Sequence, residues 1–117
     1  MTQELFDLSN KTIILTGSAG RLGANFAEIL ADAGANLVLI DINEEGNKKL
    51  EKKIIEKFKI KCICSSANIT VKKELLELSK IIIKKFGRID GLVNNAFYNP
   101  RINIEQSARR FEDYSLD

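Results

Sequence analysis

The sequence contains no histidine, no tryptophan, one proline and only two cysteines, Cys62 and Cys64. Without histidine or further cysteines, the two thiols cannot complete a tetrahedral metal site, so no metal site is expected. Two cysteines separated by one residue on a strand point to the same face of a sheet, where they pack as small hydrophobic side chains. A disulfide is not expected either, because a reducing compartment keeps such thiols free.

The chain also lacks an excess of charge of one sign and a long hydrophobic run. Its 18 lysines and arginines stand against 16 aspartates and glutamates, which gives a net charge of +2. The lysines are interleaved with glutamates, so no nucleic acid partner is expected. No run approaches the roughly 18 apolar residues that span a bilayer, and no secretion signal opens the chain. We therefore expect a cytoplasmic protein with no membrane partner, and a single domain over residues 1–117.

The most informative stretch is the glycine-rich run of residues 16–23, Thr-Gly-Ser-Ala-Gly-Arg-Leu-Gly. It stands between an apolar run and a helical pattern, which is where the phosphate loop of a dinucleotide site belongs. Gly17 would allow a tight turn, Gly20 would let backbone N–H groups approach a pyrophosphate, and Gly23 would let the helix pack on the strand. The helix N-terminus would then face the anion. An ordinary strand-to-helix turn remains the alternative.

Apolar periodicity predicts strands over residues 12–16, 37–40, 61–64 and 91–93, after a polar lead of residues 1–10. Helices are predicted over 22–33, from an Asn43 cap to Phe58, and from a Thr70 cap to Gly87. Their apolar stripes are Leu22, Phe26, Ile29, Leu30 and Ala33, then Leu50, Ile54 and Phe58, then Leu75, Leu78, Ile82 and Phe86. The solvated face of the second helix carries Lys48, Lys49, Lys52, Lys53 and Lys57. Side chains of the lead that can cover the end of the sheet are Leu5, Phe6 and Leu8.

Strands this apolar are buried on both faces, so the pattern predicts an α/β fold of the Rossmann type. It consists of a doubly wound parallel sheet with helices on both faces, truncated after the fourth strand. Such sheets bind ligands at the carboxyl ends of their strands, beside the point where strand order reverses. The glycine loop, Asp41, Asn68 and the segment 94–96 all follow strand ends. The sequence therefore predicts a ligand site at this edge.

On these residues the chain resembles the N-terminal half of a short-chain dehydrogenase/reductase, over essentially its whole length. Residues 16–23 resemble the family's glycine motif, and Asn94-Asn95-Ala96 resembles the start of its Asn-Asn-Ala-Gly motif. Arg21 stands where single-domain members usually have the second glycine, and the spacing is similar to that of extended, epimerase-like members. Phe97 replaces the last glycine of the second motif. Both departures concern the geometry of a loop.

The resemblance implies a nicotinamide cofactor, NAD in preference to NADP. Asp41 would accept hydrogen bonds from the adenosine ribose, and its charge would repel a 2′-phosphate. Arg21 argues the other way, because a guanidinium can pair with that phosphate, although it is also readily explained as a surface arginine. Asn68 and Ile69 stand at adenine-contacting positions, where Asn can offer a donor and an acceptor. Asn94 is expected to tie neighbouring strands together. The implied cofactor-binding residues are Gly17, Ser18, Ala19, Gly20, Arg21, Leu22, Gly23, Asp41, Ile42, Asn68, Ile69, Asn95 and Ala96.

The segment after the fourth strand carries a finer resemblance. An aromatic residue, a Pro-Arg pair at 100–101 and the run Arg-Arg-Phe-Glu-Asp at 109–113 are similar to dehydrogenases encoded among flagellin-modification and surface-polysaccharide genes. Substrates of that group would be sugars or sugar nucleotides. Arg101, Arg109 and Arg110 could meet an anionic substrate, or they could simply be solvated. Residues 98–108 are expected to form a loop, and residues 115–117 resemble the start of a helix.

The family's catalytic signature is absent from these residues. By resemblance, a tyrosine acts as general acid/base, with a lysine four residues later that lowers its pKa from the ordinary value near ~10 and a serine that orients the carbonyl. Tyr98 is followed four residues later by Ile102, and Tyr114 lies three residues from the end. We therefore expect the cofactor-binding half of an oxidoreductase that moves a hydride between a nicotinamide cofactor and an alcohol or carbonyl substrate. No catalytic residue is assigned, and no turnover by the chain alone is expected.

Two other functions remain open on the sequence. One is a non-catalytic nucleotide-binding or interaction module, in which the same loop binds a nucleotide without turnover. The other is an epimerase-like, sugar-nucleotide-modifying relative, suggested by the glycine spacing. A small-molecule substrate and a homo-oligomer are expected for a full-length relative only, because the helices that form such assemblies in the family are not among these residues.

Overall fold

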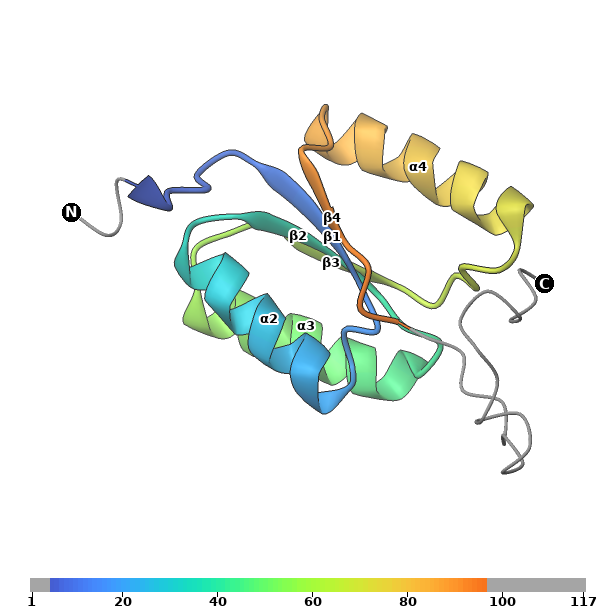
Figure 1. The fold of residues 1–117 in the computed structure, drawn as a ribbon, viewed down its shortest axis with the longest axis horizontal. Coiled ribbons are helices and arrows are strands. Elements are labelled where there is room, and N and C mark those ends of the chain that lie inside the picture. Colours follow the sequence, from blue (N-terminus) through green and yellow to red (C-terminus); the bar gives the residue numbers. More distant parts are fainter. Residues whose placement is uncertain (1–4, 97–117) are drawn as a thin grey trace, which may run out of the picture.

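The computed structural model describes residues 5–96 and confirms the predicted alternation of strands and helices (Figure 1). The elements are β1 (Thr12–Thr16), α2 (Arg21–Asp32), β2 (Asn36–Ile40), α3 (Glu44–Lys57), β3 (Cys62–Ser65), α4 (Lys72–Phe86) and β4 (Gly91–Val93). The predicted bounds differ from these by no more than one residue. The loop predicted at 98–108, the arginines Arg101, Arg109 and Arg110, and the helix start at 115–117 lie outside the described residues.

The four strands form one parallel sheet in the order β3-β2-β1-β4. The chain runs outward from β1 to β3 and then crosses back, so that β4 lies on the other side of β1. At the centre of the sheet, Ile14 pairs with Val38 of β2 and with Leu92 of β4. Strand order therefore reverses between β1 and β4, and the carboxyl ends of these strands are where a ligand site is expected.

Alternate residues of each strand feed two separate cores, as the period of two along a strand requires. Leu37 and Leu39 of β2 belong to the core beneath α2 and α3, whereas Val38 and Ile40 belong to the core beneath α4. Figure 1 shows α2 and α3 together on one face of the sheet and α4 on the other. The predicted doubly wound arrangement is confirmed for the described strands.

Helix α2 confirms only part of the predicted stripe. Phe26 and Leu30 are partly buried and pack against the core, whereas Leu22 and Ile29 are 58% and 66% exposed. The fully buried residues of the helix are Gly23, Ala27 and Ala31. The predicted stripe was placed by the large apolar side chains. The helix instead presents its smallest residues to the sheet, which lets the two backbones come close together. The predicted stripes of the other helices are confirmed at Leu50, Ile54, Leu78 and Ile82, while Leu75 is exposed.

The helix ends confirm two of the predicted signals and correct a third. The side chain of Asn43 accepts a hydrogen bond from Gly46 N–H and caps α3. Gly87 ends α4 in the left-handed conformation with φ 78°. The N-cap of α4 is Val71, which makes no side-chain cap, so the predicted Thr70 cap is wrong. The Thr70 hydroxyl instead donates to Asn68 Oδ1 at 2.6 Å.

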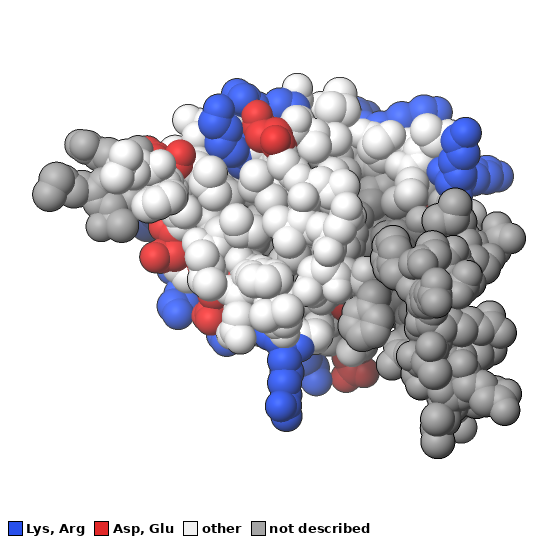
Figure 2. Space-filling model, viewed as in Figure 1, with Lys and Arg blue, Asp and Glu red and all other residues white. Residues whose placement is uncertain are grey.

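The lysines of α3 are exposed, as their pattern predicts. In the view of Figure 2, charged side chains stand mainly at the rim, around an uncharged middle. The lysines of α3 form exposed ion pairs with carboxylates one turn earlier or on α2, namely Lys48–Glu44, Lys49–Glu45, Lys53–Glu28 and Lys57–Glu28. In the N-terminal lead, Leu8 packs against the core, but Leu5 and Phe6 are exposed and do not cover the sheet.

Candidate functional site

A cleft of about 570 Å³ opens at the carboxyl ends of the strands. The predicted cofactor residues that line it are Gly17, Gly20, Arg21, Leu22, Gly23, Asp41, Ile42, Asn68, Ile69, Asn95 and Ala96. Ser18 and Ala19 belong to the same loop but do not line the cleft, whereas Ile40, Ala67 and Thr70 line it without having been predicted. The structure thus brings all four predicted polar signals together in one place.

The glycine loop has the close approaches that its sequence predicts. Gly17 has φ +66°, and a Cβ atom on it would lie 3.0 Å from the backbone of Ala96. A Cβ on Gly23 would lie 2.1 Å from the carbonyl oxygen of Gly17, so no larger residue fits there without displacing backbone. A Cβ on Gly20 would meet that same oxygen at 3.5 Å, an ordinary contact. The close approaches at Gly17 and Gly23 therefore require glycine. At Gly20 the missing side chain leaves the backbone accessible from the cleft.

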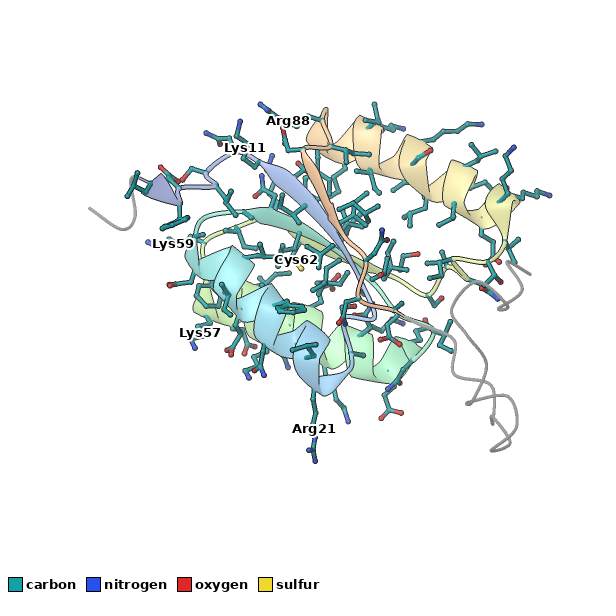
Figure 3. The ribbon with its side chains drawn as sticks, in the orientation of Figure 1. Lys11, Arg21, Lys57, Lys59, Cys62 and Arg88 are labelled. Atoms are coloured by element: carbon teal, nitrogen blue, oxygen red, sulfur yellow. The ribbon has the colours of Figure 1, made fainter. Side chains whose placement is uncertain are left out.

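The N-terminus of α2 faces the cleft without a protein side chain to satisfy it. Its N-cap is Gly20, which makes no side-chain cap, and its first turn contains no acidic residue. The N–H groups of the first turn and the positive end of the helix dipole can therefore interact with an anion bound in the cleft. The side chain of Arg21 is exposed and extends away from the body of the molecule (Figure 3).

Asp41 links the end of β2 to the glycine loop. Its Oδ2 accepts a hydrogen bond from Ala19 N–H at 2.9 Å, and its Oδ1 accepts one from Asn43 N–H at 2.8 Å. An ionised carboxylate has roughly four acceptor positions, so each oxygen can accept a further hydrogen bond from a ligand. The side chain is half-buried at the wall of the cleft, and Ile42 beside it is exposed.

The segment after β3 also lines the cleft. Asn68 Oδ1 already accepts hydrogen bonds from the N–H and the hydroxyl of Thr70, at 2.9 and 2.6 Å. Both lone pairs of this oxygen are therefore used, and the amide of Asn68 can offer a ligand its donor group but not the acceptor that we expected. Ile69 beside it exposes an apolar side chain.

Thr16 and Asn95 join the end of β4 to the glycine loop. The Thr16 hydroxyl oxygen accepts hydrogen bonds from the N–H groups of Asn95 and Ala96, both at 3.0 Å. The side chain of Asn95 donates to Gly17 O at 3.2 Å. The strand-tying role expected for Asn94 is therefore performed by Asn95, because Asn94 is exposed and Asn95 points back toward β1.

The residue that sequence reasoning missed is Asn47. It is 1% exposed on α3, and its side chain contacts the glycine loop through Ser18, which is itself 0% exposed. The signal was present in the sequence, because Asn47 precedes Leu50 by three residues and Ile54 by seven and so lies on the buried stripe. A polar residue on an apolar stripe needs hydrogen-bond partners inside the protein.

The two cysteines are free thiols on the same face of β3, as predicted. Cys62 lies between the sheet and the helices in Figure 3. Burial raises the pKa of the Cys62 thiol to about 12. Burial, together with a hydrogen bond to Glu51, raises the pKa of the Cys64 thiol to about 11. Both thiols therefore stay protonated at neutral pH and are weak nucleophiles.

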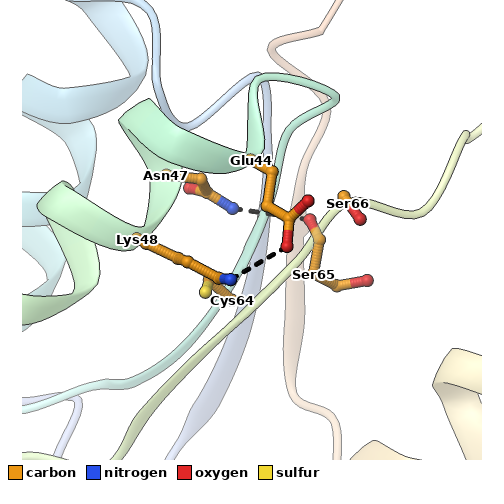
Figure 4. Close-up of a pocket in the computed structure, with 6 residues that line it drawn as sticks. All are labelled: Glu44, Asn47, Lys48, Cys64, Ser65 and Ser66. Atoms are coloured by element: carbon orange, nitrogen blue, oxygen red, sulfur yellow. Dashed lines mark hydrogen bonds and ion pairs between the residues drawn. The ribbon is translucent and has the colours of Figure 1, made fainter.

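A second, smaller cavity of about 240 Å³ lies between α3 and the end of β3 (Figure 4). Its charged lining residues, Glu44 and Lys48, form an ion pair with each other at 2.9 Å. Within residues 5–96, no three His, Cys, Asp or Glu side chains gather closely enough to hold a metal ion. In that same range, no helix combines the length and the hydropathy that crossing a membrane requires.

Comparison with known proteins agrees with this geometry. The sequence pattern of the short chain dehydrogenase family matches residues 11–115. The chain belongs to the short-chain dehydrogenase family. It is 44% identical over 87 residues to a diacetyl reductase, (S)-acetoin forming, of Staphylococcus epidermidis, an alignment that covers 74% of this chain and 34% of that protein.

Solved structures of family members have the same fold. A xylitol dehydrogenase with bound NAD+ superposes with a TM-score of 0.73 at 30% identity, over 78% of this chain and 35% of that one. The L-sorbose reductase of Gluconobacter frateurii, solved with NADPH and L-sorbose, gives a TM-score of 0.76 at 26% identity, over 86% of this chain and 38% of that one. This short-chain dehydrogenase sequence thus spans about a third of the length of the relatives that it matches.

Proposed function

We propose that the cleft binds a nicotinamide dinucleotide, NAD in preference to NADP, and that the chain is the cofactor-binding part of an oxidoreductase. The observation that carries the proposal is the position of the Asp41 carboxylate, which lines the cleft and holds Ala19 of the glycine loop at 2.9 Å. The family match favours an oxidoreductase over a nucleotide-binding module without turnover or an epimerase-like relative.

The pyrophosphate of the cofactor would lie at the N-terminus of α2. The unsatisfied first-turn N–H groups and the helix dipole favour an anion there, and the absence of a side chain at Gly20 leaves the backbone accessible. No acidic residue in the first turn competes for these donors. This arrangement supports a phosphate-bearing ligand of either kind, NAD or NADP.

Discrimination between NAD and NADP would come from Asp41. Its two oxygens can still accept hydrogen bonds from the ribose hydroxyls, whereas a 2′-phosphate would place negative charge beside a carboxylate in a partly desolvated cleft. Arg21 could favour NADP by pairing with the 2′-phosphate, but its exposed side chain extends away from the body of the molecule (Figure 3). Ile42 and Ile69, which both line the cleft, offer apolar surface for the adenine.

The bound cofactor would supply hydride chemistry at its nicotinamide ring, and the substrate would be an alcohol or the corresponding carbonyl compound. A sugar or sugar nucleotide is the narrower proposal, supported by the carbohydrate substrates named for xylitol dehydrogenase and L-sorbose reductase. Tyr98 is followed four residues later by Ile102, and residues 1–117 contain no Tyr-x-x-x-Lys motif. We therefore assign these residues to cofactor binding and expect no turnover from them alone.

The preference for NAD is tested by calorimetric titration of the chain with NAD and NADP, before and after Asp41→Asn. The unmodified chain should bind NAD at least about tenfold more tightly than NADP, a difference of about 1.4 kcal/mol. Asp41→Asn removes the charge but keeps one oxygen for Ala19 N–H, so the preference should fall to within about threefold. The gain should come mostly from tighter NADP binding.

The matched control is Asp32→Asn, which removes one exposed carboxylate at the opposite end of α2. It should leave the ratio of the two affinities unchanged, because a solvated charge at that distance is screened. Equal binding of NAD and NADP by the unmodified chain would contradict the specificity, and binding of neither would contradict the proposed function as a whole.

A further inference from the structure

We propose that Asn47 and Ser18 form a buried hydrogen-bonded pair that positions the glycine loop for the cofactor pyrophosphate, which makes Asn47 a positioning residue. The inference rests on the proposed function, because it concerns the same loop. Asn47 does not line the cleft that would hold the cofactor, so its effect on binding would act through its hydrogen-bond partners, of which Ser18 belongs to the glycine loop.

The contact is short and fully buried. The Ser18 hydroxyl donates to Asn47 Oδ1 at 2.6 Å, and both residues are at most 1% exposed. The Nδ2 group of Asn47 donates to Leu39 O at 2.9 Å and to Ser65 O at 3.4 Å. One amide on α3 thus joins the glycine loop to the ends of β2 and β3.

The chemistry of the partners fixes the orientation of the amide. Two backbone carbonyls can only accept hydrogen bonds, so the NH2 group must face Leu39 and Ser65, and the oxygen is left to accept from Ser18. The two donor hydrogens of Asn47 are then used, and its oxygen has a partner. A buried amide satisfied in this way is worth more than an exposed one, since leaving a partner unpaired costs its full desolvation.

The loop needs such an anchor at Ser18. Gly17 and Gly20 stand on either side of the Ser18–Ala19 segment and impose little restriction of their own on the backbone. Ala19 is held by Asp41, and Gly17 by Ile40 O at 2.8 Å. The hydroxyl of Ser18 is the one side-chain group within residues 17–20 that can fix the loop from beneath.

The test compares ADP and adenosine as probes by calorimetry, together with amide hydrogen exchange, in the unmodified chain, in Ser18→Ala and in Ser79→Ala. ADP carries the pyrophosphate that the loop would bind, whereas adenosine does not. Ser79 is the matched control, because its hydroxyl bonds within α4 to Leu76 O, away from the cleft. Asn47→Leu is the second variant. It also removes the hydrogen-bond donor of Leu39 O and Ser65 O, so its ligand binding is interpreted only if the variant folds.

Ser18→Ala should weaken ADP binding by about fivefold to tenfold, the effect of one buried hydrogen bond, and leave adenosine binding within about twofold. Exchange of the Ala19 and Gly20 amides should accelerate, while the amides of α4 stay unchanged. Loss of ADP and adenosine affinity in parallel would show a general structural effect and overturn the inference. Equality of Ser18→Ala and Ser79→Ala in every measurement would overturn it as well.

Failure of the proposed function gives a different result. An unmodified chain that binds neither ADP nor NAD overturns the cofactor role of the cleft, and with it the positioning role of Asn47. An unmodified chain that binds both, with Ser18→Ala unaffected, leaves the cofactor site standing and rejects only the role of Asn47.

Discussion

Asp41 Oδ2 accepts a hydrogen bond from the backbone N–H of Ala19 at 2.9 Å. The side chain proposed to accept hydrogen bonds from the ribose hydroxyls therefore also holds the glycine loop, which is proposed to bind the phosphates. The same carboxylate holds Asn43 N–H, at the start of α3, with its other oxygen. A change at Asp41 thus alters both the charge of the cleft and the support of the loop, which is why the isosteric Asn is the informative substitution.

Gly23→Ala and Gly20→Ala should separate folding from cofactor binding. The new methyl at Gly23 would lie 2.1 Å from Gly17 O, so we expect Gly23→Ala to lower the free energy of unfolding by roughly 1–3 kcal/mol. Gly20→Ala meets only an ordinary contact at 3.5 Å and should leave stability within about 1 kcal/mol. Gly20→Ala should nevertheless weaken NAD binding, because its methyl group would lie on the side of the loop where the pyrophosphate is proposed to bind.

Chemical denaturation measures the stability of both variants, and calorimetric titration measures NAD binding by Gly20→Ala. Equal stability of Gly23→Ala and the unmodified chain would mean that the helix does not approach the loop as described. A Gly20→Ala variant that binds NAD normally would place the pyrophosphate elsewhere.

Acid should destabilise the fold partly through Asp90. Its hydrogen bonds with Arg88, and a second contribution from Thr12 N–H, hold the pKa of this carboxyl below its usual 3.8. The folded-state pKa therefore lies below that of the unfolded chain. The ionised carboxylate contributes stability above pH 3.8, and this contribution is lost as the pH falls through the folded-state pKa.

Asp90→Asn should lower the free energy of unfolding at neutral pH and make it fall less steeply as the pH is lowered. Urea denaturation at about ten pH values between roughly pH 2 and 7 measures both effects. Asp32→Asn serves as the comparison, since Asp32 is exposed. If the free energy of unfolding depends on pH identically in Asp90→Asn and the unmodified chain, the Asp90 carboxylate does not stabilise the fold through its hydrogen bond with Thr12 N–H.

The two thiols should react slowly in the folded chain. Burial raises the pKa of Cys62 to about 12 and that of Cys64 to about 11, so very little thiolate is present at neutral pH. Alkylation by iodoacetamide, followed by mass spectrometry, should accelerate sharply when urea unfolds the chain. Rapid alkylation of Cys62 under native conditions would contradict its place in the core beneath α2 and α3.

Asn43→Ala should destabilise α3 by about 1 kcal/mol, because its side chain accepts the hydrogen bond of Gly46 N–H at 3.1 Å. Thr70→Ala should cost less, since Thr70 caps no helix in the structure. Circular dichroism followed through thermal unfolding compares the two. A larger loss for Thr70→Ala would restore the capping role that the sequence suggests.

The features that could be predicted from the sequence are those set by local pattern. Gly17, Gly20 and Gly23 fall between a strand and a helix at a spacing that reports on the turn itself. Asp41 follows β2 directly, and parallel strands bring all such residues to one edge. For the same reason the segment ending at Ala96 was placed at the cleft before the structure was known.

The features that were missed depend on which of several available partners a side chain contacts. The predicted α2 stripe of Leu22, Phe26, Ile29, Leu30 and Ala33 follows the large apolar side chains, which dominate a periodicity argument. Leu22 and Ile29 are exposed instead, and the loop beneath the helix requires Gly23 at the contact. The Thr70 hydroxyl was assigned to a helix cap, but Asn68 is a nearer partner. Asn47 was overlooked although its place on the buried stripe could have revealed it.

The most direct test of the account is a 15N–1H NMR spectrum of the chain titrated with NAD. The amide shifts at saturation should concentrate at Gly20, Arg21 and Gly23 of the loop, at Asp41 and at Ala96, with α4 unaffected. Shifts centred instead on Glu44 and Lys48 at the smaller cavity, or no shifts at all, would contradict a cofactor site at the glycine loop.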